Sequence, residues 1–99
     1  MPIHRVVKMT FKPENLDDFL LVFEESKDKI RARSGCLSLQ LIQDLDRPNI
    51  LSTSSIWESQ NDLEDYRNSE LFIETWRKTK IHFSEKAEAK SYEILYWLP

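Results

Sequence analysis

Cysteine, histidine and glycine are scarce in this sequence, and each scarcity excludes a class of structure or chemistry. Cys36 is the single cysteine among 99 residues, so no intrachain disulfide forms. A small domain without disulfides is typical of a reducing compartment. The two histidines, His4 and His82, lie far from each other and from Cys36 along the chain, without the close spacing of metal ligands. We therefore expect no metal site.

A long apolar run and a strong net charge are also missing. The N-terminal segment MPIHRVVKMTF lacks the apolar core of a signal peptide, and no stretch approaches the length of a membrane span. The formal net charge is −3, with acids and bases interspersed, which disfavours attraction to nucleic acid or anionic lipid. These features predict a cytoplasmic protein with no nucleic-acid and no membrane partner. The length suits one small domain over residues 1–99.

The first third of the sequence predicts a strand followed by a helix. Alternating side chains over residues 3–11 are typical of a strand, with Arg5 on the same face as Val7. The helix that follows has an apolar stripe made of Leu16, Phe19, Leu20, Phe23 and Ile30. It is expected to stop near Ser34, because Gly35 is the only glycine and suits the left-handed conformation of a C-terminal cap.

The middle of the sequence predicts a hairpin and then two helical segments. Residues 37–42 and 50–57 alternate like strands, and the turn-forming residues 44–49 between them favour an antiparallel pair. Ser59 and Ser69 are each suited to cap a helix, so the second helical region is expected in two pieces.

The final strand is expected from Ala87 to Leu98, with apolar residues on both faces. Its bulky residues are Tyr92, Ile94, Leu95, Tyr96, Trp97 and Leu98. The resulting order β-α-β-β-α-β predicts an α+β, ferredoxin-like fold whose antiparallel four-stranded sheet carries the helices on one face. Burial on both faces of the last strand implies that a second subunit covers the other face, so we expect a homodimer.

Three segments of the sequence resemble a known family. They are SGCLSLQL, DRPN and IWESQNDLEDYRNSELF, and they include the pairs Gly35-Cys36 and Leu63-Glu64 and the triplet from Trp57 to Ser59. The chain resembles the antibiotic biosynthesis monooxygenase (ABM) domain family over almost its whole length. The resemblance implies a dimeric α+β barrel with a ligand pocket between the sheet and the helices of each subunit.

The resemblance also implies a set of activities. Some members of the family oxidise anthrones or hydroquinones with O₂ and with no metal or bound flavin, whereas others degrade haem. The haem degraders use a Trp and a His at positions that are Tyr66 and Trp76 here, so the haem ligand is missing. His82 lies six residues beyond Trp76, about 240° around a helix, and does not replace it. A pocket histidine of some quinone-forming members falls on Leu71.

Six residues are the candidates for a substrate pocket, and no catalytic residue is identified. They are Trp57, Thr53, Tyr66, Trp76, Arg5 and Phe72. The family resemblance places Trp57 on the pocket wall and Thr53 at a polar position of the same strand face. Trp76 would add a second wall, and Tyr66 would supply a hydrogen bond. Arg5 would bind a phenolate or another anion from an otherwise apolar strand face.

Each candidate also has a structural interpretation. Trp57 and Trp76 are suited to fill the core, and Tyr66 to bury its ring while its hydroxyl stays in solvent. Arg5 is suited to pair with Glu93 or another carboxylate across the sheet. Among the remaining residues, His4 and His82 are expected at the surface, and Cys36 is expected to pack as a small apolar residue.

The leading functional hypothesis is a cofactor-independent monooxygenase that oxidises a small aromatic, anthrone-like or quinol-like compound with O₂. The alternative is a non-enzymatic dimer that binds a small ligand or acts in a stress response on the same fold, since a fold does not fix an activity. Haem degradation is the third hypothesis.

Overall fold

The computed structural model describes residues 1–99 as eight elements in the order that the sequence predicts. They are β1 (Ile3–Thr10), the short 3-10 helix η1 (Pro13–Asn15), α1 (Leu16–Arg31), β2 (Cys36–Gln43), β3 (Ile50–Trp57), α2 (Gln60–Arg67), α3 (Glu70–Lys80) and β4 (Glu88–Glu93). The expected hairpin is present as β2 and β3, and the second helical region is divided into α2 and α3 as expected.

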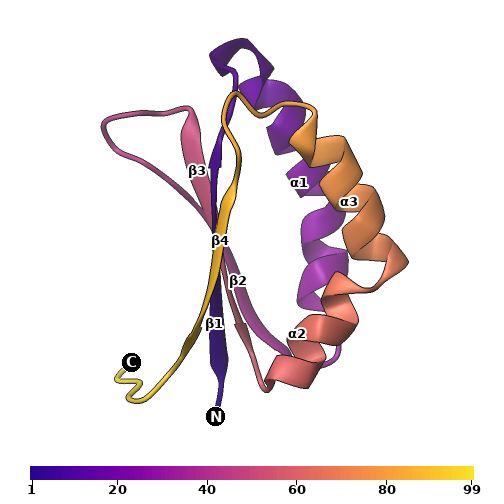
Figure 1. Ribbon diagram of the computed structural model, residues 1–99, viewed down its shortest axis with the longest axis vertical. Coiled ribbons are helices and arrows are strands. Elements are labelled where there is room, and N and C mark those ends of the chain that lie inside the picture. Colours follow the sequence, from indigo (N-terminus) through magenta and orange to yellow (C-terminus); the bar gives the residue numbers. More distant parts are fainter.

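The four strands form one antiparallel sheet in the order β2-β3-β1-β4. Figure 1 shows all the helices on one side of this sheet and none on the other. The fold is therefore the α+β, ferredoxin-like arrangement predicted from the sequence. We call the side without helices the open face. It carries His4 and Val6 from β1, whereas Arg5 and Val7 point toward the helices.

Serine side chains begin both helices of the second helical region. Ser59 Oγ accepts a hydrogen bond from the backbone N–H of Asp62, and Ser69 Oγ accepts one from the backbone N–H of Phe72. Each bond satisfies one of the free N–H groups of a first helical turn. The two predicted caps are confirmed.

The single glycine adopts the predicted left-handed backbone conformation, but the helix before it ends earlier than predicted. Gly35 has φ of 82°, in the left-handed region. However, α1 ends at Arg31, with Ala32 as its C-terminal cap, so the prediction that the helix runs to about Ser34 was wrong. Gly35 lies in the turn that leads from α1 into β2. A β-carbon at this position would lie 2.3 Å from Asp62 Cγ, so both the conformation and the space require glycine.

The last strand is shorter than the sequence predicts. β4 covers Glu88–Glu93, and the segment 94–99 has no regular structure. Backbone pairing with the N-terminus ends at a hydrogen bond from the Ile94 N–H to the Pro2 carbonyl oxygen. The prediction of a strand to Leu98 with apolar residues on both faces was therefore wrong. The apolar residues of the segment 94–98 extend beyond the sheet, where most of them are exposed.

Two clusters of buried side chains lie between the sheet and the helices. One is formed by Met9, Phe11, Phe19 and Leu51, and the other by Cys36, Trp57 and Leu63. Cys36 packs as a small apolar residue, as expected, and its burial raises the pKa of its thiol. The two clusters hold the helices at opposite ends of the sheet and leave space between them.

Candidate functional site

A cavity of about 290 Å³ lies between the sheet and the three α-helices. We call it the main cavity. Its lining is formed by Arg5, Val7, Met9, Phe19, Val22, Phe23, Ser26, Ile30, Leu39, Thr53, Ser55, Leu63, Tyr66, Arg67, Phe72, Thr75, Trp76, Thr79 and Ala89. Most of these residues are hydrophobic, and the volume is near the lower limit of ligand pockets, about 300–1,000 Å³. The cavity therefore has the size and chemistry for one small, largely apolar molecule.

One wall of the main cavity is aromatic. Tyr66 on α2 meets Phe72 on α3 edge to face, with ring centroids 5.3 Å apart. Phe72 stacks on Trp76 one helical turn later, at 5.9 Å and 10° between the planes. The spacing of four residues places Phe72 and Trp76 on one side of α3. The helices thus present a row of three rings to the cavity, which favours a flat aromatic ligand.

Trp57 lies behind this wall rather than on it. Its side chain is 0% exposed and is absent from the lining of the main cavity. The indole stacks on Tyr66, with centroids 5.0 Å apart, and its Nε1–H donates to Ser55 Oγ at 3.0 Å. The placement of Trp57 on the pocket wall, which the resemblance implies, is not what this geometry shows. Trp57 supports the ring of Tyr66 from behind.

The sheet forms the floor of the cavity and contributes three polar side chains to it. Thr53 and Ser55 alternate along β3 and face the helices. Arg5 stands beside Ser55 on the neighbouring strand, and its Nη1 donates to Ser91 Oγ of β4 at 3.0 Å. No ion pair joins Arg5 to any carboxylate, so the predicted pairing with Glu93 was wrong. The strand register explains this result, because Glu93 lies opposite Ile3.

Five of the six candidate residues therefore lie together around one cavity: Arg5, Thr53, Tyr66, Phe72 and Trp76. Sequence reasoning missed Arg67, Ser55 and Ala89, which also line it. Arg67 pairs with Glu64 at 3.0 Å, three residues earlier on α2, and such a pair is typical of a solvated helix face. Its place at the cavity follows only from the way α2 sits on the sheet.

None of the lining residues is a general base at neutral pH. The lining contains no Asp, Glu, His, Lys or Cys. Its one phenol is Tyr66, and burial raises the pKa of this group to about 12, so Tyr66 stays protonated and can donate a hydrogen bond but cannot take up a proton. Any acidic proton of a bound molecule must therefore leave by way of solvent or before binding.

Both histidines lie away from the cavity and are partly exposed at the surface. His4 is half-buried on the open face, where its Nε2 lies 2.6 Å from Ser54 Oγ. His82 follows α3, and its Nδ1 lies 3.2 Å from Asn15 Nδ2 at the start of α1. Each ring thus has one side-chain partner and remains partly in contact with solvent. No group of three or more His, Cys, Asp or Glu side chains is arranged to hold a metal ion.

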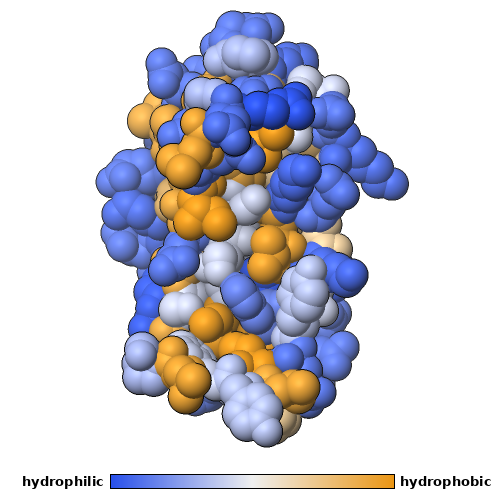
Figure 2. All heavy atoms as spheres, turned by 90° about the vertical axis from the view of Figure 1, so that its left-hand side faces the viewer, coloured by the Kyte–Doolittle hydropathy of each residue, from blue (hydrophilic) through white to orange (hydrophobic).

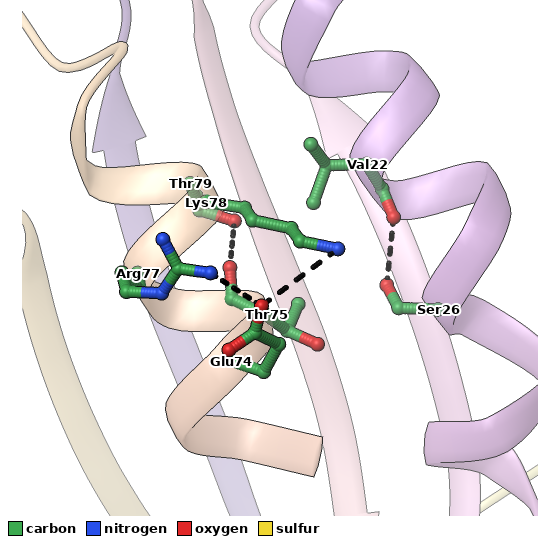
Figure 3. Close-up of polar contacts among 7 residues, drawn as sticks. All are labelled: Val22, Ser26, Glu74, Thr75, Arg77, Lys78 and Thr79. Atoms are coloured by element: carbon green, nitrogen blue, oxygen red, sulfur yellow. Dashed lines mark hydrogen bonds and ion pairs between the residues drawn. The ribbon is translucent and has the colours of Figure 1, made fainter. Parts of the chain in front are cut away.

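A second, polar cavity of about 300 Å³ lies between α1 and α3 and shares Val22, Ser26 and Thr75 with the main cavity. Figure 3 shows the bonds at this contact, which we call the helix seam. Ser26 Oγ donates to the Val22 carbonyl oxygen, and Thr79 Oγ1 donates to the Thr75 carbonyl oxygen. Each hydroxyl is thus bonded within its own helix, and charged side chains such as Glu74 and Lys78 lie on the outer side.

None of the three α-helices has both the length and the apolar composition of a membrane span.

Comparison with solved structures shows how widely this fold occurs. A conserved protein from Methanosarcina mazei Go1 is 23% identical, with 93% of this chain and 91% of that chain covered and a TM-score of 0.90. Rv0793 from Mycobacterium tuberculosis is 15% identical over the full length of both chains, with a TM-score of 0.91. A protein described as an antibiotic biosynthesis monooxygenase is 19% identical, with 95% and 99% covered and a TM-score of 0.88.

Comparison with families and with curated proteins gives two further results. No curated protein matches the sequence. The family model described as antibiotic biosynthesis monooxygenase matches residues 2–78, which include β1, the hairpin and the whole aromatic wall. This chain therefore belongs to the antibiotic biosynthesis monooxygenase (ABM) family.

Proposed function

We propose that this protein is a cofactor-independent monooxygenase that oxidises a small aromatic, anthrone-like or quinol-like compound with O₂. The observation that carries the proposal is the main cavity, a largely apolar space walled by Tyr66, Phe72 and Trp76, with a few polar groups for the oxygens of a ligand. Membership of the ABM family supports the reaction class. The small volume favours a compound of one or two rings, or a flat tricyclic one that fills the space completely.

The proposed reaction needs no cofactor because the substrate supplies its own electrons. Loss of a proton from the activated CH₂ group of an anthrone gives an electron-rich anion, which passes one electron to O₂. Recombination of the two radicals forms a carbon–oxygen bond. The resulting peroxide loses water, so the CH₂ group becomes a carbonyl that holds one oxygen atom of O₂, and the other atom leaves in the water. The protein contributes a dry, shaped space and stabilisation of negative charge.

The residues have distinct roles in this proposal. Phe72 and Trp76 hold the rings of the substrate by stacking, and Tyr66 donates a hydrogen bond to an oxygen of the substrate. Arg5 stabilises the anion that forms when the proton is lost. Thr53 offers a hydroxyl from the floor of the cavity to a second oxygen.

Oxygen uptake with a panel of anthrones and hydroquinones tests the proposal. Wild type is expected to exceed the autoxidation rate on at least one compound and to release the quinone. Trp76→Ala removes a stacking surface and is expected to lower kcat/KM about 10-fold, which corresponds to about 1.4 kcal/mol. The control is Ile73→Ala on the same helix, because Ile73 is 59% exposed and does not line the cavity. Uptake at the autoxidation rate with every compound would contradict the proposal.

The second candidate function is binding of a small aromatic molecule without catalysis. It is favoured by the absence of any proton acceptor from the lining of the main cavity. In that case the same compounds bind with a defined affinity, and Trp76→Ala weakens binding, but no oxygen is consumed. Haem degradation has less support, because no histidine lines the cavity to coordinate an iron.

We infer that the working unit is a homodimer formed through the open face. This face has no helices over it, and Figure 2 shows hydrophobic patches along it between hydrophilic margins. Its apolar residues include Val6, Ile42, Ile56 and Tyr92. The C-terminal segment 94–99 adds exposed apolar side chains next to it. A surface of this kind is typical of a self-association site, and a second copy is the simplest cover.

Light scattering after gel filtration tests the dimer. The expected mass is twice that of the 11.8 kDa chain. Tyr92→Asp places a charge on the open face, where Tyr92 is 49% exposed, and is expected to give the monomer mass. Ile73→Asp places the same charge on the helical side and is expected to leave the dimer intact. A monomer mass for wild type at micromolar concentration would contradict the inference.

A further inference from the structure

Arg5 is a charged residue in a place where charge is costly. It projects from β1 into the main cavity beside Val7 and Met9, and burial is the largest cause that lowers the pKa of its guanidinium. An arginine remains protonated even with such a shift, so the cavity contains a positive charge. Within the protein, the guanidinium makes one hydrogen bond, to Ser91 Oγ, although it carries five N–H donors. Most of its donor capacity is free for a ligand.

No negative charge of the protein neutralises Arg5. The lining of the cavity includes no Asp or Glu, and no ion pair involves Arg5. The nearest charges are those of Arg67, which lowers the pKa of Arg5 further, and Glu64, which raises it. Glu64 is already bonded to Arg67 at 3.0 Å, so these two charges largely cancel each other. The end of the cavity near Arg5 therefore has an excess of one positive charge.

We propose that the main cavity selects ligands that carry a negative charge, with an anionic oxygen bound to the Arg5 guanidinium and the aromatic ring against Tyr66, Phe72 and Trp76. A half-buried guanidinium without a counter-ion is unfavourable, and an anion from the ligand relieves this cost while it uses the free N–H donors. The ligand class is thus an aromatic anion. Oxidation of that ligand rests on the proposed function, but its binding does not.

The negative charge has two chemical sources, a carboxylate substituent or an ionised ring hydroxyl. The cavity itself does not take up the proton, because Tyr66 is the only other titratable group in the lining besides the two arginines and it stays protonated. A ring hydroxyl therefore has to ionise in solvent or under the influence of Arg5. The two sources differ in pH dependence: binding of a carboxylate is constant from about pH 6 to 9, whereas binding of a phenolate rises with pH as the hydroxyl of the ligand ionises.

Equilibrium dialysis with three related probes tests the proposal: a naphthoate, its neutral methyl ester and a naphthol. Wild type is expected to bind the naphthoate, or the naphthol at a pH where it is ionised, about 10- to 100-fold more tightly than the ester. Arg5→Gln is expected to remove this preference and to leave the affinity for the ester unchanged. Arg5→Lys keeps the charge and is expected to retain part of the preference. Lys80→Gln, which removes a charge from the exposed end of α3 outside the cavity lining, is the matched control and is expected to behave like wild type.

The result that overturns the proposal is equal affinity of wild type for the ester and for both anions, or an anion preference that survives in Arg5→Gln. If Arg5→Gln does not fold, Arg5→Met, which also removes the charge and keeps an unbranched side chain, gives the same decision. Oxygen uptake with the same probes separates this proposal from the proposed function. Binding of anions through Arg5 without oxygen uptake supports the anion site and contradicts the proposed monooxygenase activity. Oxidation of neutral compounds at a rate that does not change in Arg5→Gln supports the monooxygenase activity and contradicts the anion site.

Discussion

Replacement of Trp57 by alanine is expected to lower the free energy of unfolding by about 3–5 kcal/mol. The indole is completely buried, belongs to the cluster with Cys36 and Leu63, and stacks on Tyr66. Its removal leaves a large void and also frees Ser55 Oγ from the Nε1–H. A small domain has a total stability of about 5–15 kcal/mol, so this loss is a large fraction of the total.

Urea unfolding followed by circular dichroism measures this effect at a fixed protein concentration. Trp57→Phe keeps an aromatic ring for Tyr66 to stack on and is expected to lose less stability than Trp57→Ala. Leu45→Ala is the control, because Leu45 is 98% exposed in the turn between β2 and β3. Its effect is expected within about 0.5 kcal/mol. A loss below about 1 kcal/mol in Trp57→Ala would show that Trp57 is not the centre of this cluster.

Replacement of Gly35 by alanine is expected to lower the free energy of unfolding by about 2–4 kcal/mol. The left-handed conformation of Gly35, with φ of 82°, costs a residue with a β-carbon about 1–2 kcal/mol. The new methyl group would also lie 2.3 Å from Asp62 Cγ and force that side chain to move. Movement of the Asp62 side chain would also break the hydrogen bond that Ser59 Oγ donates to Asp62 Oδ2 at the start of α2, at a cost of about 1 kcal/mol.

A double-mutant cycle separates the two causes. Asp62→Gly removes every side-chain atom that the new methyl group would strike, including the β-carbon at 2.5 Å, so the combination of Gly35→Ala with Asp62→Gly is expected to cost less than the sum of the single changes. The remainder is the cost of the backbone conformation. Additive effects in denaturant unfolding would mean that the methyl group and Asp62 do not collide.

The elements that are bounded by turn-forming or helix-capping residues could be predicted from the sequence. The hairpin follows from the turn at 44–49, and α2 and α3 begin at Ser59 and Ser69 because a serine hydroxyl satisfies a free N–H of the first turn. The end of β4 carries no such signal. The apolar residues of the segment 94–98 look like a strand, yet the sheet ends at Glu93 because β1, its pairing partner, begins only at Ile3.

The candidate site was predictable where its residues follow a helical period. Phe72 and Trp76 are four residues apart, so one wall of the cavity could be read from the sequence. Trp57 and Arg5 were harder, because alternation along a strand gives the face of a residue but not its depth or its neighbours. Trp57 is covered by Tyr66, and the place of Arg5 opposite Ser91 instead of Glu93 depends on strand register.

The helical layer is the side of the cavity that can move more easily, because of the way α1 and α3 meet at the helix seam. No side-chain hydrogen bond or ion pair joins α1 to α3, since Ser26 and Thr79 are each bonded within their own helix. A small separation of the two helices therefore loses only dispersion contacts, which weaken gradually with distance. Separation of β1 from β3 would instead break a ladder of backbone hydrogen bonds along eight residue pairs. We therefore expect the helices, and not the sheet, to move when the cavity adapts to the size of a bound molecule.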